Sequence, residues 1–284
     1  MEPFVRVNIK DGEPERLSIR SWEDAFPELS VGFTGRGGGA GTSPYDSLNL
    51  ALHVGDNPDV VIANRAKLAE SVGFSFDAWT CGEQVHDTRV GVVSAEHRGR
   101  GRKDRSSSFE DTDGLITNVP GVLLTSFYAD CVPLYFFDPV HHAVGLAHAG
   151  WKGTVQQIAL QMVMRMQEEY GSRPDEIRTA IGPSIGECCY EVDEHVMSRV
   201  RSIVPEHSQR ELEAKVASAS VNPGKSMLNL KELNRIIMIK AGILPSHIEC
   251  TTWCTSCSTD LFFSYRKEKG TTGRMASWIG MKER

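Results

Sequence analysis

Short runs of apolar and β-branched residues, separated by turn residues, recur along the chain and predict β-strands. Six of these runs cover residues 5–9, 90–93, 121–127, 134–137, 143–147 and 177–181. Three longer segments have the apolar spacing of helices. One begins at Asn57-Pro58, a capping residue followed by proline, and the other two cover residues 154–170 and 228–241. Because predicted strands often follow one another without an intervening helix, the pattern favours an α+β fold of mixed sheets layered with helices, in a single domain over residues 1–284.

Composition narrows the class of protein. The chain has 284 residues, of which 40% are hydrophobic and 24% charged, as in ordinary globular proteins. A net charge of −6 predicts no general attraction to nucleic acid or anionic lipid. The chain contains no apolar run long enough to span a membrane, and its first residues lack the pattern of a signal peptide. We therefore expect a cytoplasmic protein with neither nucleic acid nor membrane as partner, and its oligomeric state is left open.

The segment 96–111 is unusually basic, with five Lys or Arg residues and three consecutive serines. This composition is typical of a mobile, solvated loop that contributes little to the core. Contact with RNA or lipid is the less favoured alternative.

Two polar side chains stand at the ends of predicted strands, where rigid scaffold meets exposed loop. Cys131 follows the run 121–127, and His148 follows the run 143–147. His86 is a third metal-capable side chain. Zinc accepts imidazole and thiolate ligands, and catalytic zinc sites use three protein ligands with an open fourth position. His86, Cys131 and His148 fit that number of ligands. However, an isolated cysteine or histidine at a strand end is more often structural, and spacing alone does not decide between a zinc site and a structural role.

Short motifs follow one another in a consistent order over residues 31–280: Phe33-Thr-Gly-Arg-Gly-Gly, Tyr45-Asp-Ser-Leu-Asn-Leu, His53-Val-Gly-Asp-Asn-Pro, Glu83-Gln-Val-His, Thr112-Asp-Gly-Leu-Ile-Thr, Ala129-Asp-Cys-Val-Pro, His148-Ala-Gly-Trp-Lys-Gly, Ile181-Gly-Pro-Ser-Ile, Cys189-Tyr-Glu-Val, Phe262-Phe-Ser-Tyr-Arg and Thr272-Gly-Arg. In this order the motifs resemble the YfiH/YlmD family, whose members are also called multi-copper polyphenol oxidoreductases or laccase-domain proteins. The resemblance implies a YfiH-like fold, similar to the cytotoxic necrotizing factor catalytic domain. It also implies that His86, Cys131 and His148 bind a catalytic zinc. This chain departs from the family by having Asp87 where glycine is usual, and that residue could tighten the turn or orient an imidazole.

The family names imply two different chemistries. Laccase chemistry needs several coppers and many paired histidines, whereas this chain has nine histidines, one adjacent pair and no His-x-His sequence. Copper is therefore possible but less favoured than zinc. The better supported implication is phosphorolysis of adenosine, inosine, guanosine and methylthioadenosine, with adenosine deamination alongside. Deamination requires an activated water, and zinc lowers the pKa of water toward neutrality.

Phosphorolysis also needs groups that hold phosphate. Arginine side chains and glycine-rich backbone serve this purpose, and the candidates are Arg36, Arg65, Arg266 and Arg274. For each arginine, a surface ion pair is the competing interpretation. Asp130, beside Cys131, is a candidate acid or base, or a residue that orients a ligand, and the second role is slightly favoured. Cys131 and His148 complete the candidate catalytic set.

Other readings of the same residues lead to different functions. Cys131 could be the nucleophile and His148 the base of a hydrolase, such as an amidase acting on cell-wall precursors. The protein could also be a binding partner with a vestigial site, acting near the cell-division machinery.

Cys250, Cys254 and Cys257 are interpreted as plain thiols, with a reversible disulfide or a second metal as alternatives, because the second half of a four-ligand site is not evident. Cys188 and Cys189 are adjacent, so free thiols are expected there.

Overall fold

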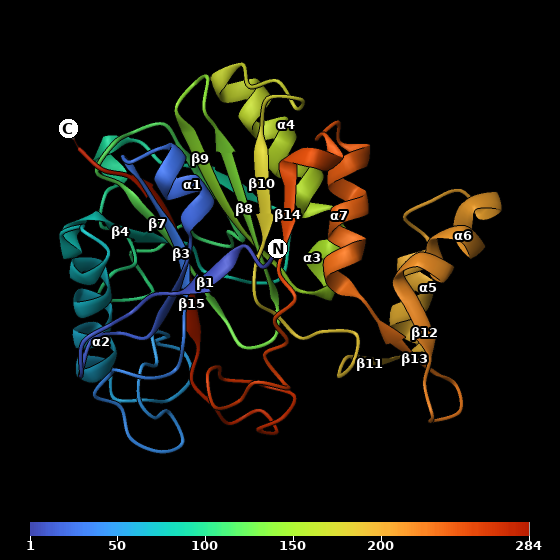
Figure 1. The fold of residues 1–284 in the computed structure, drawn as a ribbon, viewed down its shortest axis with the longest axis horizontal. Helices are drawn as coiled ribbons and strands as arrows, with labels where there is room; N and C mark the ends of the chain where they lie inside the picture. The colour runs from blue at the N-terminus through green and yellow to red at the C-terminus, as the bar shows by residue number, and fades with distance from the viewer. Residues whose placement is uncertain (284) are drawn as a thin grey trace.

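Two six-stranded sheets pack face to face in the computed structural model, which describes residues 1–283, and helices cover their outer faces (Figure 1). The first sheet has the strand order β1 (Phe4–Arg6), β2 (Arg16–Ile19), β3 (Leu29–Thr34), β15 (Met275–Met281), β7 (Leu123–Tyr128) and β4 (Trp79–Cys81). Only β4 and β7 pair in parallel among these neighbours. The strand from the end of the chain therefore lies in the middle of this sheet.

Successive side chains of the second sheet point to opposite faces and pack into two different hydrophobic cores, one between the sheets and one under the helices. Its order is β14 (Ile248–Cys250), β10 (Arg178–Ile181), β8 (Val132–Asp138), β9 (Ala143–Ala149), β6 (Gly114–Thr117) and β5 (Val90–Val92). In β8, Tyr135 and Phe137 belong to the core between the sheets, whereas Leu134 and Phe136 belong to the core under the helices. The period of two in side-chain direction accounts for this division.

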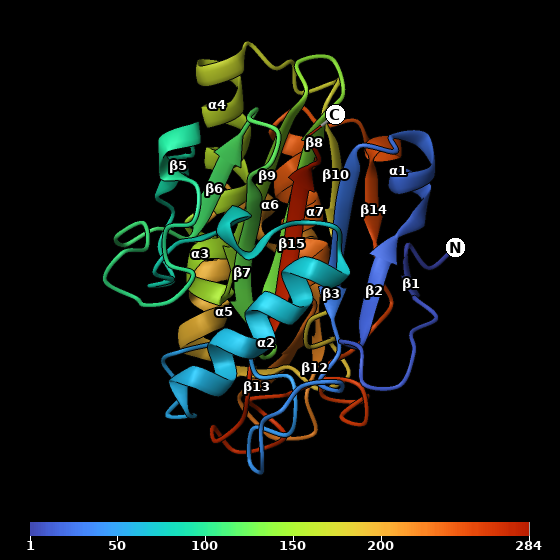
Figure 2. The same ribbon diagram turned by 90° about the vertical axis from the view of Figure 1, so that its left-hand side faces the viewer.

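Helices form the two outer layers. α2 (Pro58–Ser71) covers the first sheet, and α4 (Ile158–Tyr170) and α7 (Leu230–Lys240) cover the second (Figure 2). The short helices are α1 (Arg20–Ala25), α3 (Trp151–Val155) and the 3-10 turns η1 (Phe76–Ala78), η2 (Ala95–His97) and η3 (Pro245–His247). Within residues 1–283, the longest apolar helices are too short to cross a bilayer.

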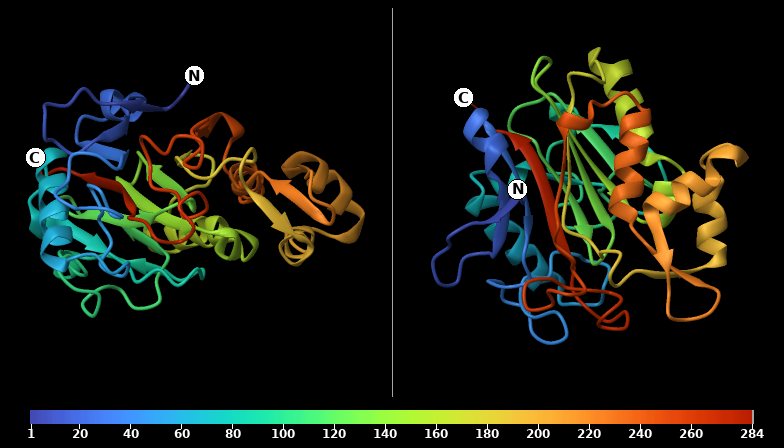
Figure 3. Two further views of the ribbon diagram at one scale, coloured as in Figure 1. Left: turned by 90° about the horizontal axis from the view of Figure 1, so that it is seen from below. Right: turned by 45° about the vertical axis from the view of Figure 1, so that its right-hand side comes forward.

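A small lobe projects beside α7 (Figure 3). It contains a three-stranded sheet of β11 (Glu191–Asp193), β13 (Lys225–Leu228) and β12 (Ala217–Ala219), together with α5 (Glu194–Arg201) and α6 (Glu206–Val216). Val196, Leu212 and Val216 join the same core as Leu233 of α7, which attaches the lobe to the second sheet.

The predicted α+β class is confirmed, and each of the six predicted strand runs overlaps an observed strand. The helix predicted at Asn57-Pro58 is also confirmed, because Oδ1 of Asn57 accepts the Asp59 N–H at 3.0 Å. The single helix predicted over 154–170 is wrong. The chain forms two helices there, because Gln157 has a left-handed backbone with φ 65°.

The segment 96–111 is packed, so the expectation of a solvated loop is wrong for its inner residues. Gly101 and Ser108 are buried. The buried guanidinium of Arg65 donates to the carbonyls of Gly101 and Arg102 at 2.8 and 3.1 Å, and Arg100 lies 4.4 Å over the Phe109 ring. The basic side chains in this segment therefore include structural ones that composition does not separate from solvated ones.

Candidate metal centre and its cavity

Three metal-capable side chains meet where the two sheets come together. His86 lies in the turn after β4, Cys131 lies in the connection between β7 and β8, and His148 is on β9. Their ligand atoms all lie within 4.8 Å of one another, and Nε2 of His86 is 3.8 Å from Sγ of Cys131. The structure thus brings together all three residues that the sequence analysis selected.

Unusual backbone conformations position these side chains. His86 has φ 64°, and Asp130, which precedes Cys131, has φ 86°, so both lie in the left-handed region that non-glycine residues rarely adopt. A Cβ atom at Gly150 would come within 2.7 Å of the His86 ring and 3.2 Å of Sγ of Cys131. Glycine at this position leaves the space in which the three ligand atoms converge.

Asp113 connects two of the candidate ligands. Its Oδ1 lies 2.7 Å from Nδ1 of His148, and its carboxylate also accepts the backbone N–H groups of Val85, His86 and Asp87 at 3.0–3.1 Å. An Nδ1–H that donates to Asp113 leaves Nε2 of His148 directed to the centre, as in carboxylate–histidine–metal triads.

Asp113 was not selected as a site residue, although it lies in the family-like stretch Thr112-Asp-Gly-Leu-Ile-Thr. The turn beside His86 shows what Asp87 does: its carboxylate accepts the Thr88 N–H at 2.8 Å, which fits the turn-tightening alternative.

The thiol and the imidazole shift each other's pKa. Burial alone would raise the pKa of Cys131, but the charge and hydrogen bonds of His148 and His86 outweigh it and lower the pKa to about 6. Burial alone would lower the pKa of His148, but the Cys131 thiolate and the Asp113 carboxylate raise it to about 9. Without a bound cation, the pair is therefore a thiolate and an imidazolium near neutral pH.

The donor set fits a metal ion. A thiolate and two imidazoles are ligands that zinc and copper accept, and the tight grouping of three such atoms is what a three-ligand site requires. The hydrogen bond from Asp113 to His148 adds the outer contact that metal-binding histidines usually make. His86, Cys131 and His148 could therefore hold a metal ion.

The three side chains line a cavity of about 540 Å³, within the usual range for small-molecule sites. Arg266 and Arg274 line the same cavity. Its other lining residues include His53, Gln84, Phe127, Trp151, Tyr190 and Tyr265. Burial and the positive charges of Arg274 and other arginines lower the pKa of His53 to about 4, so the cavity has a positive side that would favour an anion.

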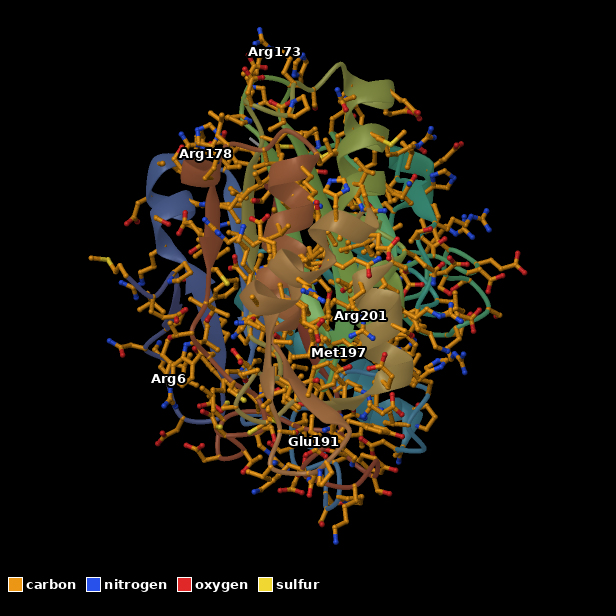
Figure 4. All side chains as sticks on the ribbon, turned by 90° about the vertical axis from the view of Figure 1, so that its right-hand side faces the viewer. Arg6, Arg173, Arg178, Glu191, Met197 and Arg201 are labelled. Atoms are coloured by element: carbon orange, nitrogen blue, oxygen red, sulfur yellow. The ribbon has the colours of Figure 1, made fainter. Side chains whose placement is uncertain are left out.

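Both cavity arginines keep free donors. Nη1 of Arg266 donates to the Glu191 carbonyl at 3.0 Å, and Glu191 is labelled near the lower end of the molecule in Figure 4. Nη1 of Arg274 donates to the carbonyls of Thr272 and Gly273. Within residues 1–283, Nη2 and Nε of both arginines donate no hydrogen bond to the protein, so these donors are available to a ligand.

The other two arginine candidates lie outside this cavity. Arg65 is 2% exposed, and its guanidinium donates to three backbone carbonyls while it lies 4.5 Å over the Phe127 ring. Arg36 donates to the carbonyls of Asp46 and Thr259 and pairs with Glu268 at 3.0 Å. Most of the donors on both guanidinium groups bond within the protein, so Arg266 and Arg274, which line the cavity, are better placed than Arg36 and Arg65 to meet a phosphate there.

Asp130 holds a loop of the cavity wall. Its carboxylate accepts hydrogen bonds from Oγ1 of Thr255 at 2.7 Å, Oγ of Ser264 at 3.1 Å and the Arg266 N–H at 2.7 Å. These three bonds use the carboxylate for positioning and favour the orienting role over the acid–base role.

The comparisons with known proteins agree with the residue pattern. A profile of the multi-copper polyphenol oxidoreductase laccase family matches residues 30–282. The purine nucleoside phosphorylase YlmD of Bacillus subtilis is 41% identical over 95% of this chain and 96% of its own length. The protein of the same name from Geobacillus stearothermophilus is 42% identical over 93% of this chain and 94% of its own length.

Solved structures give the same relationship. The crystal structure of YlmD from Geobacillus stearothermophilus has a TM-score of 0.90 at 40% identity and covers all of both chains. Bacillus licheniformis YfiH has a TM-score of 0.88 at 40% identity and covers 94% of this chain and 96% of its own. The sequence profile, the relatives and the fold all lead to one assignment, and the chain belongs to the multi-copper polyphenol oxidoreductase laccase family of YfiH and YlmD proteins.

Proposed function

We propose that this protein is a zinc-dependent purine nucleoside phosphorylase that acts on adenosine, inosine, guanosine and methylthioadenosine and also deaminates adenosine. The observation that carries the proposal is the shared cavity, which combines the His86, Cys131 and His148 trio with two arginines that keep free donors. The names of the Bacillus and Geobacillus relatives support the same substrate class. Within residues 1–283 none of the seven cysteines forms a disulfide, which fits an enzyme of the cytoplasm.

The two cavity arginines would form the phosphate-binding part of the site. Arg266 and Arg274 would bind its oxygens through charge-assisted hydrogen bonds. One phosphate oxygen forms a bond to C1′ of the ribose, and the bond from C1′ to the purine nitrogen breaks, with its electron pair leaving on the base. Tyr190 and Tyr265 line the same cavity, with Arg266 5.2 Å over the Tyr190 ring and Arg274 5.6 Å over the Tyr265 ring, so each arginine is held beside an aromatic side chain.

The remaining cavity residues would hold the metal ion and orient the groups around it. His86, Cys131 and His148 would bind zinc, which supplies Lewis acidity when bound. Asp113 keeps His148 in the tautomer that directs Nε2 to the centre. His53, held neutral by burial and by Arg274, can accept or donate a hydrogen bond without adding charge beside the phosphate.

Product analysis tests this proposal. Purified protein of known metal content is incubated with adenosine, with and without phosphate, and the products are identified. We expect adenine and ribose 1-phosphate at a rate that saturates with phosphate, and inosine that forms without phosphate but requires the metal. Equal base release in phosphate-free buffer, with free ribose as product, would overturn the phosphorylase.

A second candidate is a thiol hydrolase, such as the amidase considered above. The observation in its favour is that Sγ of Cys131 lies within 4.8 Å of a His148 ring nitrogen, that His148 in turn bonds to Asp113, and that the pKa of the thiol is lowered to about 6. This activity would survive a chelator and be abolished by alkylation of Cys131, and it would show no phosphate dependence. A multi-copper oxidase is less consistent with the fold, because residues 1–283 bring together a single histidine-containing ligand group.

A further inference from the structure

Four cysteines outside the cavity also converge. Cys188, Cys189, Cys254 and Cys257 place their sulfur atoms within 4.8 Å of one another. The sheet explains how two distant segments meet: β10 and β14 are parallel neighbours, with Ile181 opposite Cys250, so the chain leaves both strands at the same edge. Each strand is followed by a tight turn, and each turn carries two of the cysteines.

The sulfur arrangement matches a single tetrahedral ion. Sγ of Cys257 lies 3.5 Å from Sγ of Cys188 and 3.4 Å from Sγ of Cys189. A zinc–sulfur bond of about 2.3 Å places the sulfurs of a tetrahedral site about 3.8 Å apart. The ligands of an iron–sulfur cluster are spread over several metal atoms and lie further apart. The observed grouping therefore fits one ion.

Two further contacts indicate a site for thiolates. The Gly186 N–H donates to Sγ of Cys254 at 3.2 Å, which stabilises negative charge on sulfur. A Cβ at Gly186 would lie 3.2 Å from Sγ of Cys188 and from Cβ of Cys254, so the two turns pack closely at this glycine.

Plain thiols and disulfides explain the cluster less well. Burial accounts for Cys254 but not for Cys188 or Cys257, which are exposed. A disulfide needs one defined pair, whereas Cys257 is almost equally far from Cys188 and Cys189. A bridge between the two adjacent cysteines would be strained.

We propose that Cys188, Cys189, Cys254 and Cys257 bind one zinc ion in a closed, structural Cys₄ site, separate from the His86, Cys131 and His148 centre. Each thiol releases its proton to solvent as its sulfur binds the ion. The sequence analysis interpreted Cys250, Cys254 and Cys257 as plain thiols, with a second metal only as an alternative, and expected free thiols at Cys188 and Cys189. Only the parallel pairing of β10 and β14 brings the two halves together.

The zinc site would support the cavity wall from outside. The turn at 254–257 carries Thr255, which donates to Oδ1 of Asp130 at 2.7 Å, and the segment before Gly186 carries Ile185, whose N–H donates to the Asp130 carbonyl at 3.0 Å. A cation that joins the two turns would therefore hold both contacts to the residue beside Cys131.

Metal analysis of the full chain tests the proposal. We expect about two zinc ions per chain in the wild type and about one in both Cys257→Ser and His148→Ala, since each variant loses one of two independent sites. Cys250→Ser is the matched control: Cys250 lies four residues before Cys254 but outside the cluster, so this variant should keep about two.

His148→Ala supplies a measurement that does not depend on the folding of a cysteine variant. Its remaining zinc should show four sulfur ligands at about 2.3 Å by X-ray absorption. Folded His148→Ala protein without zinc, a ligand set containing nitrogen, or an intact mass that reveals disulfides among the four cysteines would each overturn the Cys₄ site. None of these results bears on whether the cavity uses phosphate.

Discussion

Asp113 accepts a hydrogen bond from Nδ1 of His148 at 2.7 Å, deep in the interface between the two sheets. The same carboxylate accepts the His86 N–H, so one side chain positions a candidate ligand in the turn after β4 and another on β9. Burial would raise the pKa of Asp113, but His148 and the backbone N–H groups outweigh it and lower the pKa. Asp113 is therefore a charged acceptor at neutral pH.

Asp113→Asn should weaken metal binding at the cavity. The amide keeps the size of the side chain but removes the charge and one acceptor, so the turn at His86 and the tautomer of His148 lose support. Loss of such outer contacts typically lowers metal affinity about 10- to 100-fold. Competition with a chelating dye measures the change, and Asp87→Asn, whose carboxylate accepts within residues 1–283 only from Thr88, is the matched control. Equal affinity in both variants would contradict this role.

Cys131 should react as a thiolate in metal-free protein from mildly acidic pH upward. Its pKa of about 6 means that the thiol is protonated below that pH and ionised above it, while His148 stays protonated up to about pH 9. The rate of alkylation, followed at Cys131 by peptide mass spectrometry, should rise with a midpoint near pH 6. In His148→Gln the largest effect that opposes burial of the thiol is lost and only His86 still lowers its pKa, so the midpoint should move upward, toward the ordinary thiol value of about 8.5. A midpoint that is the same in both proteins would exclude the thiolate–imidazolium pair.

Arg266→Ala and Arg274→Ala should each impair the use of phosphate while zinc stays bound. Loss of one charge-assisted contact costs about 1.5–3 kcal/mol, or roughly a 10- to 150-fold rise in phosphate KM. Arg36→Ala should leave the phosphate KM unchanged but lower stability, because Arg36 pairs with Glu268 and two carbonyls. Arg173→Ala, at the opposite end of the molecule from Glu191 in Figure 4, controls for loss of surface charge. An unchanged phosphate KM in both cavity variants would remove these arginines from the phosphate site.

Arg65→Met should destabilise the fold by at least about 2 kcal/mol, because the carbonyls of Leu50, Gly101 and Arg102 lose a buried donor. Urea unfolding measures this loss. Arg6→Met removes an exposed ion pair with Glu15 and should change stability by less than about 1 kcal/mol. If the two variants unfold alike, Arg65 does not hold the segment 96–111 in place.

Features of the fold and of the site that depend on neighbouring residues in the chain could be predicted from the sequence. The strand runs, the cap at Asn57 and the three candidate ligands follow from periodicity, turn chemistry and family-like motifs. The lobe at 191–228 escaped prediction because α6 buries only Leu212 and Val216, which is too weak a periodic signal to mark a helix. The break at Gln157 escaped because no glycine or proline marks it.

Long-range contacts account for the remaining differences. Arg65 and Arg266 are equally plausible phosphate ligands in the sequence, and only the packing of 96–111 on Arg65 distinguishes them. Asp113 looks like one acidic residue among many until His148 is seen beside it. Cys188 and Cys189 acquire partners only through the pairing of β10 with β14.

The central place of β15 in the first sheet has a consequence for folding, because we expect this sheet to be completed only after β15 has been synthesised. β3 and β7 do not pair with each other, and each pairs with β15 instead. During synthesis from the N-terminus, β1 to β3 must wait for residues 275–281 before they can join the strand that leads to Cys131. We therefore expect ribosome-bound chains that end at residue 270 to bind no metal at His86, Cys131 and His148, and metal capture by such chains would contradict this order.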